Sequence, residues 1–185
     1  AAHIGQERRA ADPSATGTEE YNYFLAIHFP ANQLAIMDYN RVVKDLNGLT
    51  KDEFIGALGK SFLISKKGGE PHKPSLAHQF SLYIDGEWYI LDAKKEILCD
   101  DDPIGCLDVT VLYNHVLAPV LDIKDLRHSH RIDFVGGIRG LNELKRRVDS
   151  GEMAAAFALY PVSMDQLIRI ADTDNIMPPK VTWFE

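Results

Sequence analysis

The 185-residue sequence has few of the features that mark secreted, membrane or disordered proteins. It contains two cysteines, Cys99 and Cys106, a usage that fits a reducing cytosol and excludes a disulfide scaffold. The longest apolar run, from Ala154 to Val162, falls far short of the about 18 residues that suggest a membrane span. No charged-then-apolar leader is present. We therefore expect a cytoplasmic protein with no membrane partner.

Basic residues are also scarce. Lys and Arg number 20 against 27 Asp and Glu, which gives a net charge of −7 and disfavours nucleic acid as a partner. The composition, 45% hydrophobic and 25% charged, is that of a globular protein. The chain has no initial methionine and its first residues read as the middle of a helix. We expect a fragment of a longer protein, with a helix remnant and linker over 1–20 and one domain over 21–185.

Hydrophobic periodicity predicts a single α/β or α+β domain. The run YNYFLAIHF over 21–29 is almost continuously apolar and predicts a central strand covered on both faces. Strands are also expected over 34–39 and 61–65, and helices over 41–46 and 107–118. Capping boxes at Thr50 and Ser163 predict two helix starts. Asp85-Gly86 is a strong hairpin signal and places one hairpin over 78–91.

The last third of the sequence alternates between the two periods. A strand over 131–135, a helix from Leu141 closed by Gly151, a strand over 153–160 and a helix from Ser163 to Ala171 are predicted. This strand–helix–strand–helix order predicts a parallel, right-handed crossover. Together with the antiparallel hairpin it predicts a mixed sheet.

A glycine-rich loop is the first candidate site. Gly136, Gly137 and Gly140 lie between a predicted strand and a helix start, where backbone N–H groups and the helix dipole favour an anion. Arg131, Asp133 and Arg139 bracket the loop, and the two arginines could hold a phosphate or carboxylate. The loop matches neither a Walker motif nor a dinucleotide fingerprint. The alternative is a tight turn that needs glycine for its backbone angles.

Two further cations are candidates for binding phosphate. Arg41 lies at a predicted strand-to-helix junction, from which it could reach over the end of a sheet; the alternative is a surface ion pair with Asp38 or Asp45. Lys180 follows two prolines and could point at a bound anion, or the tail could simply dock as an edge strand. The histidines and cysteines match no metal-binding spacing, so no metal site is predicted.

Four blocks of the sequence carry a resemblance to a known family. They are 21–30 (YNYFLAIHFP), 38–46 (DYNRVVKDL), 131–140 (RIDFVGGIRG) and 177–184 (MPPKVTWF). These blocks resemble the carboxy-terminal half of a prokaryotic family of unknown function, the domain-of-unknown-function family numbered 1015. The resemblance spans essentially the whole chain. One departure is Val181, where the tail of the family usually has serine.

The resemblance implies a function that the residues alone do not. Members of this family are longer and carry an Asp-Gly-His-His-Arg motif shared with ParB/sulfiredoxin-like proteins, including free-serine kinases. That motif would precede residue 1. The resemblance implies a nucleotide-dependent phosphotransferase acting on a small hydroxy-compound, with ATP or ADP and magnesium in the full-length protein. The fragment would be inactive alone, and the missing half would carry the small-molecule ligand and the catalytic groups. A ParB-like nucleotide- or DNA-binding module and a non-catalytic scaffold half are the alternatives.

Overall fold

The computed structural model describes residues 2–98 and 101–184. Cys99, one of the two cysteines, and Asp100 lie outside the described residues. The chain divides into two compact units, Ala1–Leu34 and Ala35–Glu185. Among the described residues, no helix combines the length and apolarity needed to cross a bilayer.

The first unit contains one regular helix, α1 (Ala2–Ala11), as predicted for the start of the chain. A short 3-10 turn, η1 (Glu20–Asn22), packs against it. The side chain of Arg9 donates to Asn22 Oδ1 from Nε at 3.1 Å. Gly5 is buried and lies so close to Tyr21 that an added Cβ would be 2.9 Å from the Tyr21 carbonyl oxygen. These contacts account for the compactness of the unit.

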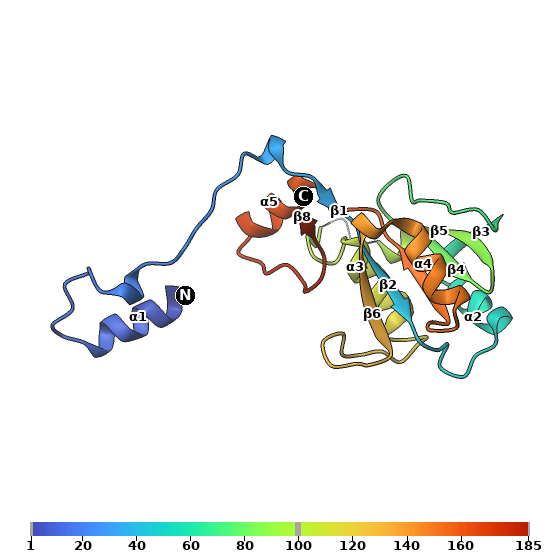
Figure 1. Cartoon of the computed structure of the whole chain (residues 1–185), viewed down its shortest axis with the longest axis horizontal. Helices are drawn as coiled ribbons and strands as arrows, with labels where there is room; N and C mark the ends of the chain where they lie inside the picture. Colours follow the sequence, from blue (N-terminus) through green and yellow to red (C-terminus); the bar gives the residue numbers. More distant parts are fainter. Residues whose placement is uncertain (1, 99–100, 185) are drawn as a thin grey trace. The chain divides into compact units, whose positions relative to one another are not determined.

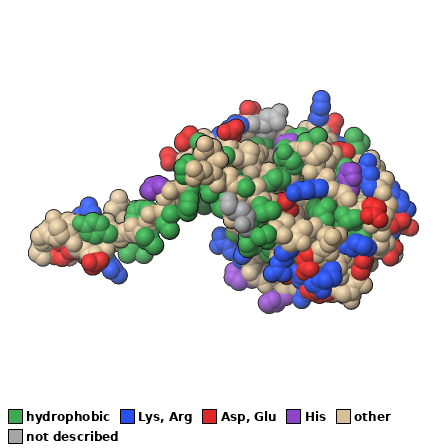
Figure 2. Space-filling model, turned by 45° about the horizontal axis from the view of Figure 1, so that its top comes forward, with side chains coloured by type: hydrophobic (Ala, Val, Ile, Leu, Met, Phe, Trp, Pro, Cys, Tyr) green, Lys and Arg blue, Asp and Glu red, His purple; other side chains and the backbone are tan. Residues whose placement is uncertain are grey.

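The central strand predicted over 21–29 is wrong for this chain. Residues 23–30 are extended but pair with no other described strand, and a second 3-10 turn, η2 (Ala31–Gln33), follows them. Phe24 and Leu25 are 72% and 88% exposed, and Figure 2 shows hydrophobic side chains exposed on the surface beside charged ones. The sequence pattern is that of a strand, but a strand forms only where its backbone groups find partners.

The second unit is built on a six-stranded sheet of order β3-β5-β4-β7-β2-β6 (Figure 1). Its strands are β2 (Tyr39–Val43), β3 (Phe62–Gly68), β4 (Gln79–Ile84), β5 (Glu87–Ala93), β6 (Ile132–Gly136) and β7 (Ala155–Ala158). A two-stranded sheet pairs β1 (Ile36–Met37) with β8 (Trp183–Phe184). The predicted hairpin is confirmed: Asp85 and Gly86 have φ of 49° and 77° and join β4 to β5.

Helices cover both faces of the large sheet. On one face, α2 (Lys51–Leu58) and α3 (Asp108–Leu112), which continues as a π-turn over Tyr113–Leu117 (η4), pack on a cluster that includes Val43, Phe80 and Phe157. On the other face, α4 (Gly140–Asp149) packs on Val42, Tyr83 and Trp88. The helix α5 (Met164–Asp172) belongs to a third cluster. Both capping boxes, at Thr50 and Ser163, are confirmed.

The α+β class is therefore confirmed, but two details of the prediction are wrong. Every pair of neighbouring strands described is antiparallel, so the sheet is not mixed. Strands β6 and β7 do run in the same direction on either side of helix α4 in the sequence, but β2 lies between them and pairs antiparallel with both. The α4 connection therefore skips one strand rather than joining neighbours.

The second error concerns the helix predicted over 41–46. Residues Tyr39–Val43 form β2, the strand between β7 and β6. Val42 and Val43 are both fully buried, on opposite faces of the sheet. Adjacent β-branched residues that bury on opposite faces favour a central strand over a helix. This correction matters for function because it places Arg41 in the sheet.

Candidate anion-binding site

Arg41 is the most unusual side chain in the second unit, because it is a cation that is only 1% exposed. It lies opposite Phe134 of β6 and Phe157 of β7. Its Cζ is 4.7 Å from the centre of the Phe134 ring and 5.8 Å from that of Tyr39. The guanidinium thus lies against two aromatic rings on one face of the sheet, which stabilises a desolvated cation in part.

The charge of Arg41 has no carboxylate partner among the described residues, since no ion pair of that part of the chain includes it. Its Nη1 donates to the backbone oxygen of Tyr39 and its Nη2 donates to that of Lys180 at 2.7 Å. Burial lowers the pKa of Arg41 to about 9, so the group remains protonated at neutral pH. A buried charge without a counter-charge costs several kcal/mol, and among the described residues only aromatic rings and backbone oxygens offset that cost for Arg41.

The alternative of a surface ion pair for Arg41 is wrong. Asp38 is buried and instead contacts Lys73 Nζ at 3.2 Å and the side chain of Asn40. Asp45 receives the hydrogen bonds of Arg131. Both carboxylates proposed as partners are therefore occupied elsewhere.

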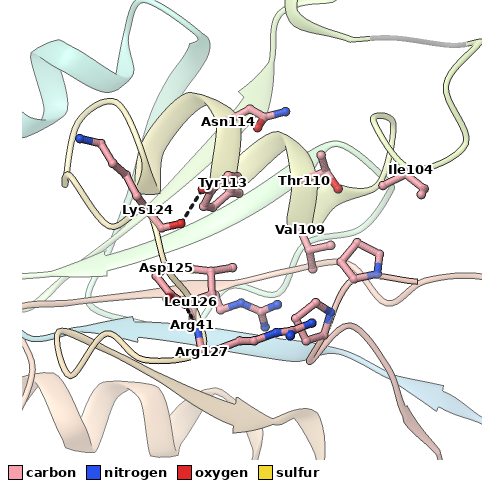
Figure 3. Close-up of a pocket in the computed structure, with 12 residues that line it drawn as sticks. Arg41, Ile104, Val109, Thr110, Tyr113, Asn114, Lys124, Asp125, Leu126 and Arg127 are labelled. Carbon is pink, nitrogen blue, oxygen red and sulfur yellow. Dashed lines mark hydrogen bonds between the residues drawn. The ribbon is translucent and has the colours of Figure 1, made fainter. Parts of the chain in front are cut away.

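Arg41 lines a cavity of about 550 Å³, which we call the Arg41 pocket. Figure 3 shows Val109, Thr110 and Tyr113, on α3 and its continuation, across this pocket from Arg41 and Arg127. The Tyr113 hydroxyl donates to the Lys124 backbone oxygen at 2.7 Å and so holds the loop over 124–127 at the rim. The full lining consists of Arg41, Ile104, Val109, Thr110, Tyr113, Asn114, Lys124, Asp125, Leu126, Arg127, Pro178 and Pro179.

The charges around this pocket are predominantly positive, although the chain carries a net −7. Lys124 forms an exposed ion pair with Asp122 at 2.7 Å. Asp125 accepts the backbone N–H of Arg127 at 2.8 Å, and its other oxygen lies 2.8 Å from His128 Nδ1. Among the described residues that line this pocket, Arg41 and Arg127 are therefore the cations without a carboxylate partner. The pocket is an apolar chamber with cations at one side, which suits an anionic group on a larger molecule.

A second cavity of about 420 Å³ adjoins the first, and we call it the Lys180 pocket. The two share Leu126, Arg127 and Pro179. The Lys180 pocket is completed by Tyr39, Ser129, Ile132, Asp133, Phe134 and Lys180. The structure thus brings two of the predicted phosphate ligands, Arg41 and Lys180, to adjoining cavities.

The tail that carries Lys180 docks as a strand, as the alternative reading of this segment predicted. Trp183 and Phe184 form β8 and pair with β1. The indole of Trp183 lies over Gly136, where a Cβ would meet it at 3.0 Å. This docking coexists with the ligand-binding reading, because Lys180 precedes β8 and lines the pocket.

The glycine loop has a packing role. Gly137 donates its N–H to the Asp38 backbone oxygen at 2.7 Å, and a Cβ on Gly137 would lie 2.6 Å from Asp38 Oδ1. A buried carboxylate thus occupies the space beside this loop. Arg139 is exposed, and Gly140 adopts φ 69° at the start of α4. These residues line neither the Arg41 pocket nor the Lys180 pocket, and the arrangement fits the tight-turn alternative.

Arg131 and Asp133 are engaged in ion pairs of their own. Arg131 Nε donates to Asp45 Oδ2 at 2.9 Å, and this bond lowers the pKa of the Asp45 carboxyl. Asp133 accepts from Arg147 Nη1 at 2.8 Å. Burial would raise the pKa of Asp133, but hydrogen bonds from the Phe134 backbone and from Arg147 outweigh it and the pKa is lowered. Asp133 therefore lines the Lys180 pocket as an ion-paired carboxylate, and it shares Arg147 with Glu152.

Sequence reasoning missed Arg127, which lines both pockets. The stretch Lys124-Asp-Leu-Arg-His-Ser-His130 reads as a polar loop, and no spacing rule singles out one cation in it. The described residues contain no group of three or more His, Cys, Asp or Glu side chains that could hold a metal ion.

Comparison with known families assigns the sequence to one of them. The sequence model of a family described as "Protein of unknown function (DUF1015)" matches residues 1–110, more than half of the chain. The chain belongs to the DUF1015 family. The match includes Arg41 and the start of α3 and stops before Arg127 and Lys180. None of the curated proteins matches this DUF1015 chain.

The DUF1015 chain is similar in fold to a solved structure of free serine kinase. A mutant of free serine kinase in complex with AMP aligns with a TM-score of 0.50 and 14% identity, covering 84% of this chain and 55% of that one. A conserved hypothetical protein from Pyrococcus furiosus aligns with a TM-score of 0.49 and 14% identity, over 82% of this chain and 56% of that one. The DUF1015 chain spans about half the length of these neighbours.

Proposed function

We propose that this chain binds a phosphate-bearing small molecule in the Arg41 pocket. We further propose that it supplies this site to a nucleotide-dependent phosphotransferase that acts on a small hydroxy-compound. The main observation in support of the proposal is that Arg41 is buried, has no carboxylate partner among the described residues, and lines a cavity. A bound phosphate would be the missing counter-charge, held by charge-assisted hydrogen bonds.

The structural similarity to free serine kinase in complex with AMP also supports binding of a phosphate-bearing molecule. A nucleotide such as AMP combines a base with apolar faces and a phosphate. The Arg41 pocket offers apolar and aromatic surface from α3 and its continuation for the base, and cations for the phosphate. Phosphoryl transfer depends mainly on positioning and on electrostatic stabilisation, which arginines supply. The described residues fit a nucleotide phosphate, but they provide no cluster for magnesium, and we assign no step to a metal.

The proposal is tested by calorimetric titration of AMP into the wild-type chain and three variants. Arg41→Gln and Arg127→Gln each remove a charged hydrogen-bond donor, worth roughly 1.5–3 kcal/mol, and should weaken AMP binding about tenfold to a hundredfold. Arg139→Gln removes an exposed arginine that lines neither pocket and is the matched control; it should bind as the wild type does.

Two outcomes would overturn the proposal. One is an absence of AMP binding by the wild-type chain at millimolar nucleotide. The other is wild-type affinity in both Arg41→Gln and Arg127→Gln. Because Arg127 is exposed, its variant is expected to fold even if Arg41→Gln does not. A loss of affinity in Arg139→Gln alone would favour the glycine loop instead.

A further inference from the structure

The Lys180 pocket has the features of a second anion subsite beside the first. It shares Arg127 with the Arg41 pocket, so one guanidinium faces both cavities. No described carboxylate forms an ion pair with either Arg127 or Lys180. Asp133, the acidic residue on the wall, forms an ion pair with Arg147 at 2.8 Å, and Arg147 also pairs with Glu152. The two adjoining pockets are therefore lined by three cations without a carboxylate partner among the described residues: Arg41 in the first, Arg127 in both and Lys180 in the second.

The backbone at Lys180 is held in a conformation that a lysine seldom adopts. Its φ is 60°, in the left-handed region, which is unfavourable for a residue with a side chain. The guanidinium of Arg41 holds it there by donating to the Lys180 backbone oxygen at 2.7 Å. The same arginine thus lines the first pocket and fixes the residue that lines the second. Strain maintained in this way is typical of residues that serve a ligand.

The wall of the Lys180 pocket carries hydrogen-bond donors that suit an anion beside its apolar and aromatic side chains. Lys180 Nζ lies 5.8 Å from the centre of the Tyr39 ring, and the Ser129 hydroxyl oxygen accepts only a long hydrogen bond, 3.3 Å from the Arg131 nitrogen. Its own O–H remains a donor for a ligand oxygen. Lysine, arginine and serine donors in one cavity are the donors that phosphate oxygens accept.

We propose that the Lys180 pocket binds a second phosphate of the same ligand, so that a molecule with two linked phosphates spans both pockets past Arg127. This inference rests on the proposed function of the Arg41 pocket and names its ligand class. A monophosphate would fill the Arg41 side alone. A nucleoside diphosphate or inorganic pyrophosphate would engage Lys180 as well, and each added charge-assisted contact should tighten binding about tenfold or more.

The test compares AMP, ADP and inorganic pyrophosphate in calorimetric titrations of the full 185-residue chain. The wild type should bind ADP at least about tenfold more tightly than AMP. Lys180→Met should lower ADP affinity about tenfold, to near that of AMP. Lys180→Gly removes the ammonium while favouring the observed φ, and it should behave in the same way even if Lys180→Met disturbs the tail. Lys95→Met, in an exposed turn away from both pockets, is the control.

Each result decides between the claims. Equal affinity for AMP and ADP in the wild type would refute the second subsite and leave the proposed function standing. An ADP preference that survives in both Lys180 variants would also refute it. Binding of neither nucleotide would refute the proposed function and this inference together. Pyrophosphate binding as tight as ADP would assign the affinity to the two phosphates, whereas much weaker binding would show that the nucleoside contributes in the Arg41 pocket.

Discussion

Replacing Gly137 with alanine separates the two interpretations of the glycine loop. The new Cβ would lie 2.6 Å from Asp38 Oδ1, 2.7 Å from its Cγ and 2.9 Å from its backbone oxygen. Ordinary contacts of a Cβ begin at 3.4 Å, so the loop and Asp38 must move apart. That movement strains the Gly137 N–H bond to Asp38 and the contacts of Asp38 with Asn40 and Lys73. Two or three such bonds at about 1 kcal/mol each predict a loss of about 2–3 kcal/mol in the free energy of unfolding.

The assay is urea denaturation followed by far-ultraviolet circular dichroism, with AMP titration of the same variant. Gly56→Ala is the matched control, because Gly56 lies within α2 with nothing near its would-be Cβ, and it should gain about 0.5–1 kcal/mol. AMP affinity should be unchanged in Gly137→Ala. The reasoning fails if Gly137→Ala unfolds within about 0.5 kcal/mol of the wild type while its AMP binding collapses, since that would make the loop an anion site.

Three further predictions follow from the same contacts. Arg41→Met should stay within about 1 kcal/mol of wild-type stability, because lost hydrogen bonds and relieved desolvation offset each other, while AMP binding weakens about tenfold to a hundredfold. Asp45→Asn should be less stable than the wild type at neutral pH by up to about 1 kcal/mol, a small value because the pair is partly exposed. The hydrogen bond from Arg131 lowers the pKa of Asp45 in the folded state. The stabilisation by this carboxylate is therefore present above about pH 4 and is lost as the pH falls through the lowered pKa. Leu25→Ser should leave stability within about 0.5 kcal/mol of the wild type.

Denaturation curves measured at neutral and acid pH check these predictions together. A loss above about 3 kcal/mol in Arg41→Met would identify a purely structural arginine. Asp52→Asn, which changes an exposed carboxylate at the start of α2, is the control for Asp45→Asn. An equal difference between Asp45→Asn and the wild type at neutral and strongly acid pH would contradict the role of Arg131. Leu82→Ala, at a fully buried position, should cost about 2–5 kcal/mol. A comparable loss in Leu25→Ser would mean that residues 21–29 form a buried strand after all.

Local signals in the sequence predicted local structure well. The capping boxes at Thr50 and Ser163 and the Asp85-Gly86 turn depend on atoms within a few residues, and each occurs where it was predicted. Strand pairing depends on distant partners, so the order of the sheet and the antiparallel partners of β7 were not predictable. The run over 21–29 shows the same limit, because its pattern is that of a strand but no described partner pairs with it.

The candidate site was predictable only in part, and for the same reason. Arg41 and Lys180 were identified by residue type and local context, but their adjacency depends on a contact across 139 positions of sequence. Arg131 and Arg139 matched the same criterion, yet one is paired with Asp45 and the other lies on the surface. A sequence does not reveal which cations lack a carboxylate partner. That property, which burial and packing decide, is what distinguishes Arg41.

The most direct test of the central claim is a crystal structure of the chain grown with ADP. The account predicts a phosphate against the Arg41 guanidinium, with oxygens about 2.8 Å from its nitrogens, and a second phosphate on the side of Arg127 and Lys180. Nucleotide bound at the Gly136–Gly140 loop, or an empty Arg41 pocket at saturating ADP, would contradict it.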